Sequence, residues 1–208
     1  MISDLIVVAE RRPWTPSGTF QLMRRLLLDR QILWLDANAF RHERPAPEDL
    51  ASTSKAPIAR AATDPAPFPL LTAEDLGVGA HPLARLVSPR LLARRVLRAA
   101  RNCRLRHPIL WLASPWGAPL LDSGYTGAVV YQMGHEQPPA DAGLAREYAE
   151  REASILARAD LVLAPSRPWL QRVSAPRRRL LPAAVDVELF FTPAQPARDL
   201  PAAGPVAG

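Results

Sequence analysis

The stretch RADLVLAPSRPWLQRVSAPRRRLLPAAVDVELF, from Arg158 to Phe190, decides the fold class of this chain. It places two short strand-like runs, ADLVLAPS and RRRLLPAAVD, on either side of a helix-sized segment, SRPWLQRV. Short apolar runs that alternate with helical segments are typical of strands in a parallel sheet that is buried on both faces. The stretch therefore predicts a strand, a short helix and the last strand of an α/β domain.

The N-terminal part of the chain shows the same alternation. Asp4 to Ala9 is an apolar run with β-branched residues, and the turn-forming loop ERRPWTPSG follows it. Apolar residues then recur at helical spacing from Phe20 to Asp29, and QILWLDA, from Gln31 to Ala37, predicts a second strand. Strand, helix and strand in this order form a βαβ unit, which crosses over right-handed into a parallel sheet.

The middle of the chain supplies the remaining predicted elements. Residues 40–69 are rich in proline, alanine and charge, which predicts a surface excursion or an irregular hairpin, and FPLLT predicts a short extended piece. The pattern further predicts helices over Ser88–Arg101 and Leu144–Arg158 and strands over His107–Pro115 and Thr126–Glu136, with SPWGAP as a simple turn. We expect one Rossmann-like α/β domain over residues 1–192, with a doubly wound, mostly parallel sheet of six or seven strands. Residues 193–208 are predicted to form a proline- and alanine-rich linker.

The composition excludes several classes of protein. The net charge is +6, but the only lysine is Lys55, and arginine usage of this kind beside abundant alanine and proline is what a GC-rich coding sequence produces. Because no nucleic-acid-binding module is recognisable, we expect no nucleic-acid partner. Four scattered histidines and the single Cys103 predict no metal site, no cofactor and no disulfide, and no glycine-x-serine-x-glycine elbow is present. The N-terminus lacks the features of a signal peptide, and no apolar run could span a membrane, so we expect a cytoplasmic protein, peripheral on the membrane at most.

Two loops carry the candidate ligand contacts, because ligands of doubly wound sheets bind at the carboxyl ends of the strands. The loop PWTPSGTF offers Trp14, Ser17 and Gly18 for approach to a phosphate or sugar at the start of a helix. The alternative is an ordinary helix-start turn. His135 and Glu136 follow a predicted buried strand, where a histidine can bind a sugar hydroxyl or carry a proton, and the alternative there is a surface loop.

Several segments, in this order, resemble the N-terminal domain of family 4 glycosyltransferases, which are retaining enzymes of the GT-B fold. They are ERRPWTPSGTFQLMRRLL, ILWLDA, VVYQMGHE, a helix with Glu147 and Glu152, ILARADLVLAPS and LLPAAVDVELF. The most specific elements are ADLVLAPS and VDVELF. The first loop has the single glycine Gly18 where the family usually has a pair.

The resemblance implies transfer of a sugar from a nucleotide-sugar donor to a glycan or lipid-linked acceptor, as in the synthesis of cell-envelope polysaccharides. It implies sugar contacts for Trp14, Ser17, Gly18, His135 and Glu136, with His135 as the candidate catalytic residue. The resemblance places Asp186 and Phe190 at an interdomain hinge, whereas turn and cap preferences give Asp160 and Ser166 structural roles. The donor is held mostly by a second domain in this family, and the terminal GPVAG resembles the start of that domain. We therefore expect a truncated, acceptor-side half that is inactive without a second domain or chain.

The predicted helix over residues 88–104 carries a row of arginines on one face: Arg90, Arg94, Arg98 and Arg101. A basic amphipathic helix can lie on an anionic membrane surface, and the alternative is a solvated face of a core helix. This row supports a second hypothesis, a non-catalytic module that binds a glycan, a lipid or a membrane surface. The sugar, the nucleotide, the acceptor and the oligomeric state stay open on the sequence alone.

Overall fold

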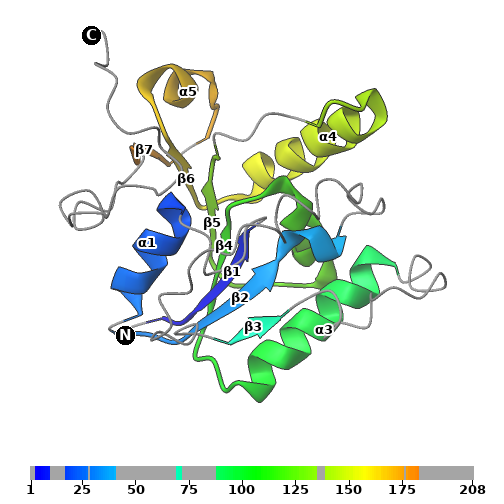
Figure 1. The fold of residues 1–208 in the computed structure, drawn as a ribbon, viewed down its shortest axis with the longest axis vertical. Helices are drawn as coiled ribbons and strands as arrows, with labels where there is room; N and C mark the ends of the chain where they lie inside the picture. The colour runs from blue at the N-terminus through cyan, green and yellow to red at the C-terminus, as the bar shows by residue number, and fades with distance from the viewer. Residues whose placement is uncertain are drawn as a thin grey trace, which may run out of the picture.

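The computed structural model describes residues 3–9, 17–27, 29–40, 69–71, 88–134, 139–175 and 177–182. Strands and helices alternate along these residues (Figure 1). The elements in chain order are β1 (Leu5–Ala9), α1 (Gly18–Leu26), β2 (Ile32–Asp36), η1 (Ala37–Phe40), β3 (Leu70–Leu71), α3 (Pro89–Asn102), β4 (Ile109–Leu112), η3 (Pro115–Ser123), β5 (Val129–Gln132), α4 (Ala142–Arg158), β6 (Leu161–Ala164), α5 (Arg167–Arg172) and β7 (Arg178–Leu180).

The strands form one seven-stranded sheet in the order β3-β2-β1-β4-β5-β6-β7, and every described strand pair is parallel. From β1 the chain moves outward in one direction to β2 and β3, and from β4 it moves in the other direction to β7. This is the strand order of a Rossmann-like, doubly wound sheet. The predicted fold class is confirmed.

Helices cover both faces of the sheet. Helix α1 lies on one face, while α3 and α4 lie on the other (Figure 1). Successive strand residues point to opposite faces, so the buried side chains divide into two clusters. One cluster packs with α1 and includes Val7, Met23 and Trp34. The larger cluster packs with α3, η3 and α4 and includes Ile6, Leu110 and Trp116.

Two aspartates connect neighbouring strands at the amino edge of the sheet. The buried Asp4 carboxylate accepts hydrogen bonds from the backbone N–H groups of Gln31 (2.9 Å) and Arg106 (2.5 Å), ahead of β2 and β4. The Asp160 carboxylate accepts one from the N–H of Val129 at the start of β5 (2.8 Å). Asp160 therefore has the structural role that the sequence predicted, but it binds a neighbouring strand rather than the preceding helix.

The segment SPWGAP corrects one prediction, because it begins a buried 3-10 helix and is not a simple turn. Residues from Pro115 to Leu121 of η3 are all buried, and η3 contacts both α3 and α4. The absence of a side chain at Gly117 allows this packing. A Cβ built there would lie 2.7 Å from Leu112 Cδ2 and 3.0 Å from Val8 Cγ1. The 3-10 helix η3 therefore forms the buried connection between β4 and β5.

The last strand lies where the sequence predicts it, but it is shorter and is not buried. The prediction spans RRRLLPAAVD, whereas β7 comprises Arg178–Leu180 and all three of its residues are exposed. It pairs with β6 alone among the described strands, so it forms one edge of the sheet. Exposed arginines suit such an edge, because charged side chains oppose pairing with a further chain.

Candidate functional site

The carboxyl ends of β1 and β4 mark the candidate site. These two strands are neighbours, with Leu5 to Val8 paired to Ile109 to Leu112, and the connections that leave them run in opposite directions. Such a switch point leaves a crevice at the carboxyl edge, where doubly wound proteins bind their ligands. The residues that follow β1, β2, β4, β5 and β6 lie at this edge and are therefore the candidates for ligand contact.

Ser17 and Gly18 lie at the start of α1, on the carboxyl side of β1. The Ser17 hydroxyl accepts a hydrogen bond from the Phe20 N–H (3.1 Å), which makes it the N-cap of the helix. The first turn of α1 contains no acidic residue, so the positive end of the helix dipole is not neutralised within that turn. This geometry fits an ordinary capped helix start, and the same geometry lets the first N–H groups face an anion.

A half-buried arginine, Arg151, fixes the two segments that follow β2 and β4. The Arg151 guanidinium donates to the backbone carbonyls of Phe40 at the end of η1 (3.3 Å) and Trp116 in η3 (3.2 Å). It also pairs with Glu147 one helical turn earlier (2.5 Å) and lies 4.8 Å from the centroid of the Trp116 ring. Trp116 in turn contacts Tyr148 edge to face, with ring centroids 5.9 Å apart. Arg151 therefore holds η1 and η3 against α4.

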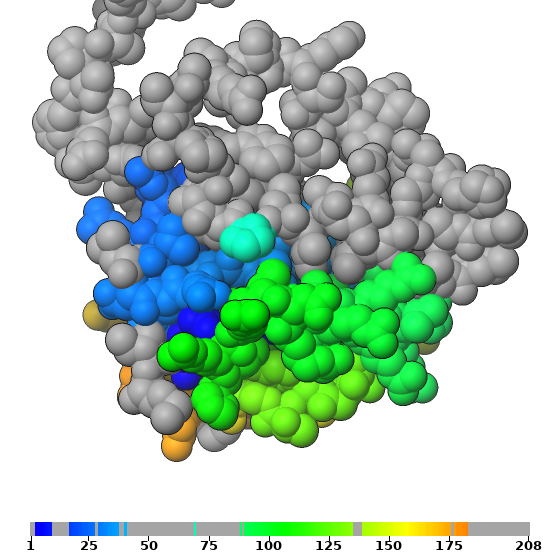
Figure 2. All heavy atoms as spheres, turned by 90° about the horizontal axis from the view of Figure 1, so that it is seen from below, coloured from blue at the N-terminus to red at the C-terminus, as the bar shows by residue number. Residues whose placement is uncertain are grey.

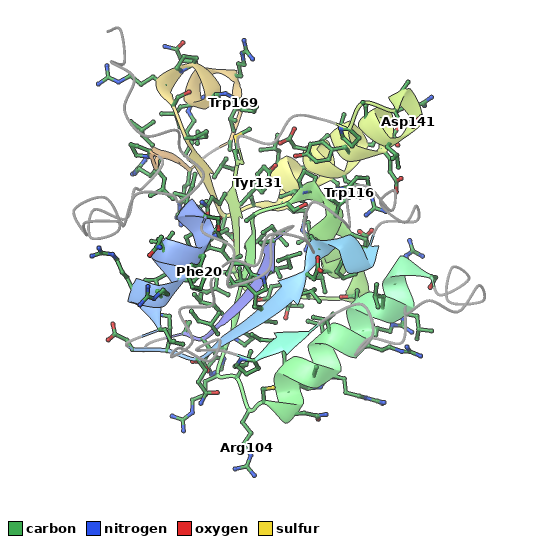
Figure 3. All side chains as sticks on the ribbon, viewed as in Figure 1. Phe20, Arg104, Trp116, Tyr131, Asp141 and Trp169 are labelled. Atoms are coloured by element: carbon green, nitrogen blue, oxygen red, sulfur yellow. The ribbon has the colours of Figure 1, made fainter. Side chains whose placement is uncertain are left out.

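Tyr131 and Glu152 form a second link between the sheet and α4. The Tyr131 hydroxyl donates to the Glu152 carboxylate over 2.5 Å, and Tyr131 is buried. Tyr131 is a residue of β5, and its side chain extends toward α4 (Figure 3). Glu147 and Glu152, which contributed to the family resemblance, are therefore both engaged in contacts within the domain.

The last residue of β5 presents an oriented amide group that the sequence analysis missed. Trp111 Nε1 on β4 donates to Gln132 Oε1 over 2.9 Å. An indole N–H can only donate, so this bond fixes which end of the carboxamide is oxygen. The NH2 group of Gln132 is the other end of the carboxamide, and it makes no hydrogen bond to the described residues. Gln132 is half-buried at the carboxyl edge, so this group can donate to a ligand oxygen.

Several predicted site residues lie outside the described residues. They are Trp14, His135, Glu136 and the hinge pair Asp186 and Phe190. Their assignments stay predictions.

Ser166 occupies the N-cap position of α5, after β6, as the sequence predicted. Its side chain makes no capping hydrogen bond, which corrects the expected cap. Only its backbone carbonyl contributes, accepting from the Leu170 N–H over 3.0 Å.

The predicted basic helix is present as α3. Arg90, Arg94, Arg98 and Arg101 are all exposed, whereas Leu92 and Val96 on the same helix are buried. The N-terminal Ser88 caps the helix by accepting from the Leu91 N–H (3.3 Å). The row of arginines therefore lies on the outer face of the domain.

The described part of the chain contains no group of three or more histidine, cysteine or acidic residues placed to hold a metal ion. None of the helices in those residues is both long enough and apolar enough to cross a membrane. No family model matches the chain, and no curated protein matches its sequence.

Proposed function

We propose that this chain is the acceptor-side domain of a retaining GT-B glycosyltransferase, which transfers a sugar from a nucleotide-sugar donor to a glycan or lipid-linked acceptor. The observation that carries the proposal is that the segments resembling the family come together at one edge of the sheet. Segments that resemble the family lead to the carboxyl edge of one parallel sheet: the start of α1 follows β1, Asp36 ends β2, Gln132 ends β5, and Ser166 follows β6. An acceptor bound beside the switch point would contact residues from several of these loops at once.

Gln132 sharpens this proposal, because its chemistry suits a hydroxyl-rich ligand. Its oriented NH2 donates to the oxygen of a sugar hydroxyl, while the Trp111 indole prevents the amide from reversing. Ser17 and Gly18 add backbone N–H groups at the start of α1, which suit a phosphate or sugar oxygen. His135, which follows β5 in the sequence, keeps its proposed role as the residue that binds the transferred sugar or carries a proton.

Saturation-transfer NMR with a panel of free mono- and oligosaccharides tests the acceptor role. We expect saturation transfer to at least one saccharide, and a large decrease in the Gln132→Glu variant, because a carboxylate accepts where the amide donates. Gln171→Glu, an identical change at an exposed position of α5, is the control and should behave as the wild type. Absence of transfer to every saccharide in the panel would contradict the proposed acceptor site.

The donor half of the proposal has its own test. In the family that the sequence resembles, the donor pocket closes between two domains, so the 208-residue chain should neither bind UDP or GDP tightly nor transfer sugar alone. Isothermal titration with UDP, GDP and their sugars measures this. Tight binding to the isolated chain would place the donor site in this domain and overturn the proposed division of roles.

A second candidate function is a non-catalytic module that binds a glycan, a lipid or a membrane surface. The exposed arginines of α3 favour it, because they form a basic outer face of the domain and none of them is among the residues proposed to contact the sugar. The two candidates differ in one measurement. Only a glycosyltransferase domain will support sugar transfer when a donor-binding domain is supplied.

A further inference from the structure

The positive charge of this chain is concentrated in one segment. Seven of the 26 basic residues, and none of the 20 acidic residues, fall between Ser88 and His107. The other 188 residues therefore carry 19 basic and 20 acidic side chains, a formal charge of −1, against +6 for the whole chain. A bias in coding composition would spread arginine along the sequence, and it does not account for this concentration.

Helix α3 presents most of this charge on one side. At about 100° per residue, the buried residues Leu92, Ala93, Val96 and Ala100 share one side of the helix, and five arginines share the other. Those arginines are Arg90, Arg94, Arg95, Arg98 and Arg101, and all five are exposed. Beyond the end of the helix, Arg104 extends away from the body of the domain (Figure 3). In the view from below, residues of α3 are at the surface and form part of the green area (Figure 2).

An exposed leucine lies inside this basic face. Leu91 is 46% exposed, and the described residues contain only one other large hydrophobic side chain that is exposed, Leu180. On the helical wheel Leu91 lies between Arg98 and Arg95, and Arg94 is one turn away from it. A face that only needed to be solvated would gain nothing from an apolar side chain at its centre.

We infer that this face of α3 docks on a lipid bilayer that contains anionic headgroups. Guanidinium groups bind phosphate oxygens with paired hydrogen bonds, and a cluster of basic side chains on one helix face is attracted by an anionic leaflet. Leu91 distinguishes a bilayer from a nucleic acid, because a bilayer offers an apolar layer beneath the headgroups that the leucine can enter. A phosphate backbone offers charge alone. The inference rests on the second candidate function and not on the proposed sugar transfer.

Co-sedimentation of the full 208-residue chain with vesicles tests the inference. The wild type should bind phosphatidylcholine vesicles that contain phosphatidylglycerol, and it should not bind vesicles of phosphatidylcholine alone. Each arginine removed should weaken partitioning about fivefold, so Arg94→Gln with Arg98→Gln should weaken it about 30-fold. Arg94→Glu with Arg98→Glu should abolish it. Leu91→Gln keeps every charge and should still weaken partitioning about fivefold.

The control reverses the same number of charges elsewhere, through Arg158→Glu with Arg167→Glu, two exposed positions on α4 and α5. This variant should bind vesicles much more tightly than the double Glu variant on α3. Circular dichroism establishes that each variant is folded, and the milder Gln variants provide the test if the Glu variants are not. Failure of the wild type to bind anionic vesicles, or equal loss in both double Glu variants, would overturn the inference. Displacement from the vesicles by duplex DNA, with no effect of Leu91→Gln, would assign the face to nucleic acid and also overturn it.

Discussion

Replacing Arg151 with methionine should lower the free energy of unfolding by about 3–4 kcal/mol. Methionine keeps the apolar stem and removes the guanidinium, so the loss isolates the polar contacts. Two of those contacts are hydrogen bonds from a charged donor to the carbonyls of Phe40 and Trp116, each worth about 1.5 kcal/mol. The position over the Trp116 ring adds about 0.5–1 kcal/mol. In a domain of this size the midpoint of thermal unfolding should fall by about 10 °C.

A matched control lies on the same helix. Arg146 pairs with Glu150 at the same spacing as Arg151 with Glu147, but its side chain is 83% exposed, against 12% for Arg151. Arg146→Met should therefore cost less than about 0.5 kcal/mol, since exposed pairs within one helix contribute little. Urea unfolding followed by circular dichroism measures both variants. Equal effects of the two substitutions would refute the reasoning, because they would mean that Arg151 acts only as another surface ion pair.

Three further predictions concern packing, pH and the amino edge of the sheet. Gly117→Ala should destabilise the domain by about 1–3 kcal/mol in urea unfolding, because its Cβ would lie 2.7 Å from Leu112 Cδ2 in a packed region. Burial raises the pKa of Tyr125 to about 12, outweighing the opposing effect of a backbone hydrogen bond from Leu110, while the nearby Asp160 charge raises it further. Folding therefore favours the protonated phenol, and the stability that this preference provides is complete below about pH 10 and is lost between about pH 10 and 12. Over that range the free energy of unfolding of the wild type should fall by about 1–2 kcal/mol, whereas that of Tyr125→Phe should not show this fall. Asp4→Ala should cost about 3 kcal/mol, because it leaves the N–H groups of Gln31 and Arg106 without an acceptor, whereas Asp122→Ala at an exposed site should be nearly neutral in the same assay.

The strands were predictable from the sequence because each buried strand is a run of apolar residues. The strands LIVVA and ILWL can be recognised from their own residues alone, because a strand with both faces against the protein interior is apolar on both faces. The 3-10 segment after β4 was not predictable in this way. Pro115, Gly117 and Pro119 are typical of a turn, and only the three-dimensional packing against Val8 and Leu112 shows why a glycine is needed there.

The contacts around the candidate site depend on partners that the sequence does not identify. Arg151 binds the backbone carbonyls of residues that are 111 and 35 positions away in the sequence. Every residue type has such a carbonyl, so the residue types do not identify these partners. The Trp111 to Gln132 bond joins neighbouring strands diagonally, so it requires the register that pairs Trp111 with Val130. A glutamine at the end of an apolar run otherwise indicates only that the strand is reaching solvent. Ser17 is different, because a serine directly before a helix predicts a cap from local chemistry alone.

The direction of α3 connects the proposed membrane contact with the candidate site. Because β3 and β4 are parallel, the chain must return from the carboxyl edge to the amino edge between them, and α3 makes that return. Its first turn, with Arg90 and Leu91, therefore lies toward the carboxyl edge, while Arg101 lies toward the amino edge, where Asp4 binds Arg106. A bilayer held by the first turns of α3 would place the carboxyl edge near the headgroups. An acceptor linked to lipid could then reach Gln132 without leaving the membrane, whereas a soluble acceptor would gain nothing from this orientation.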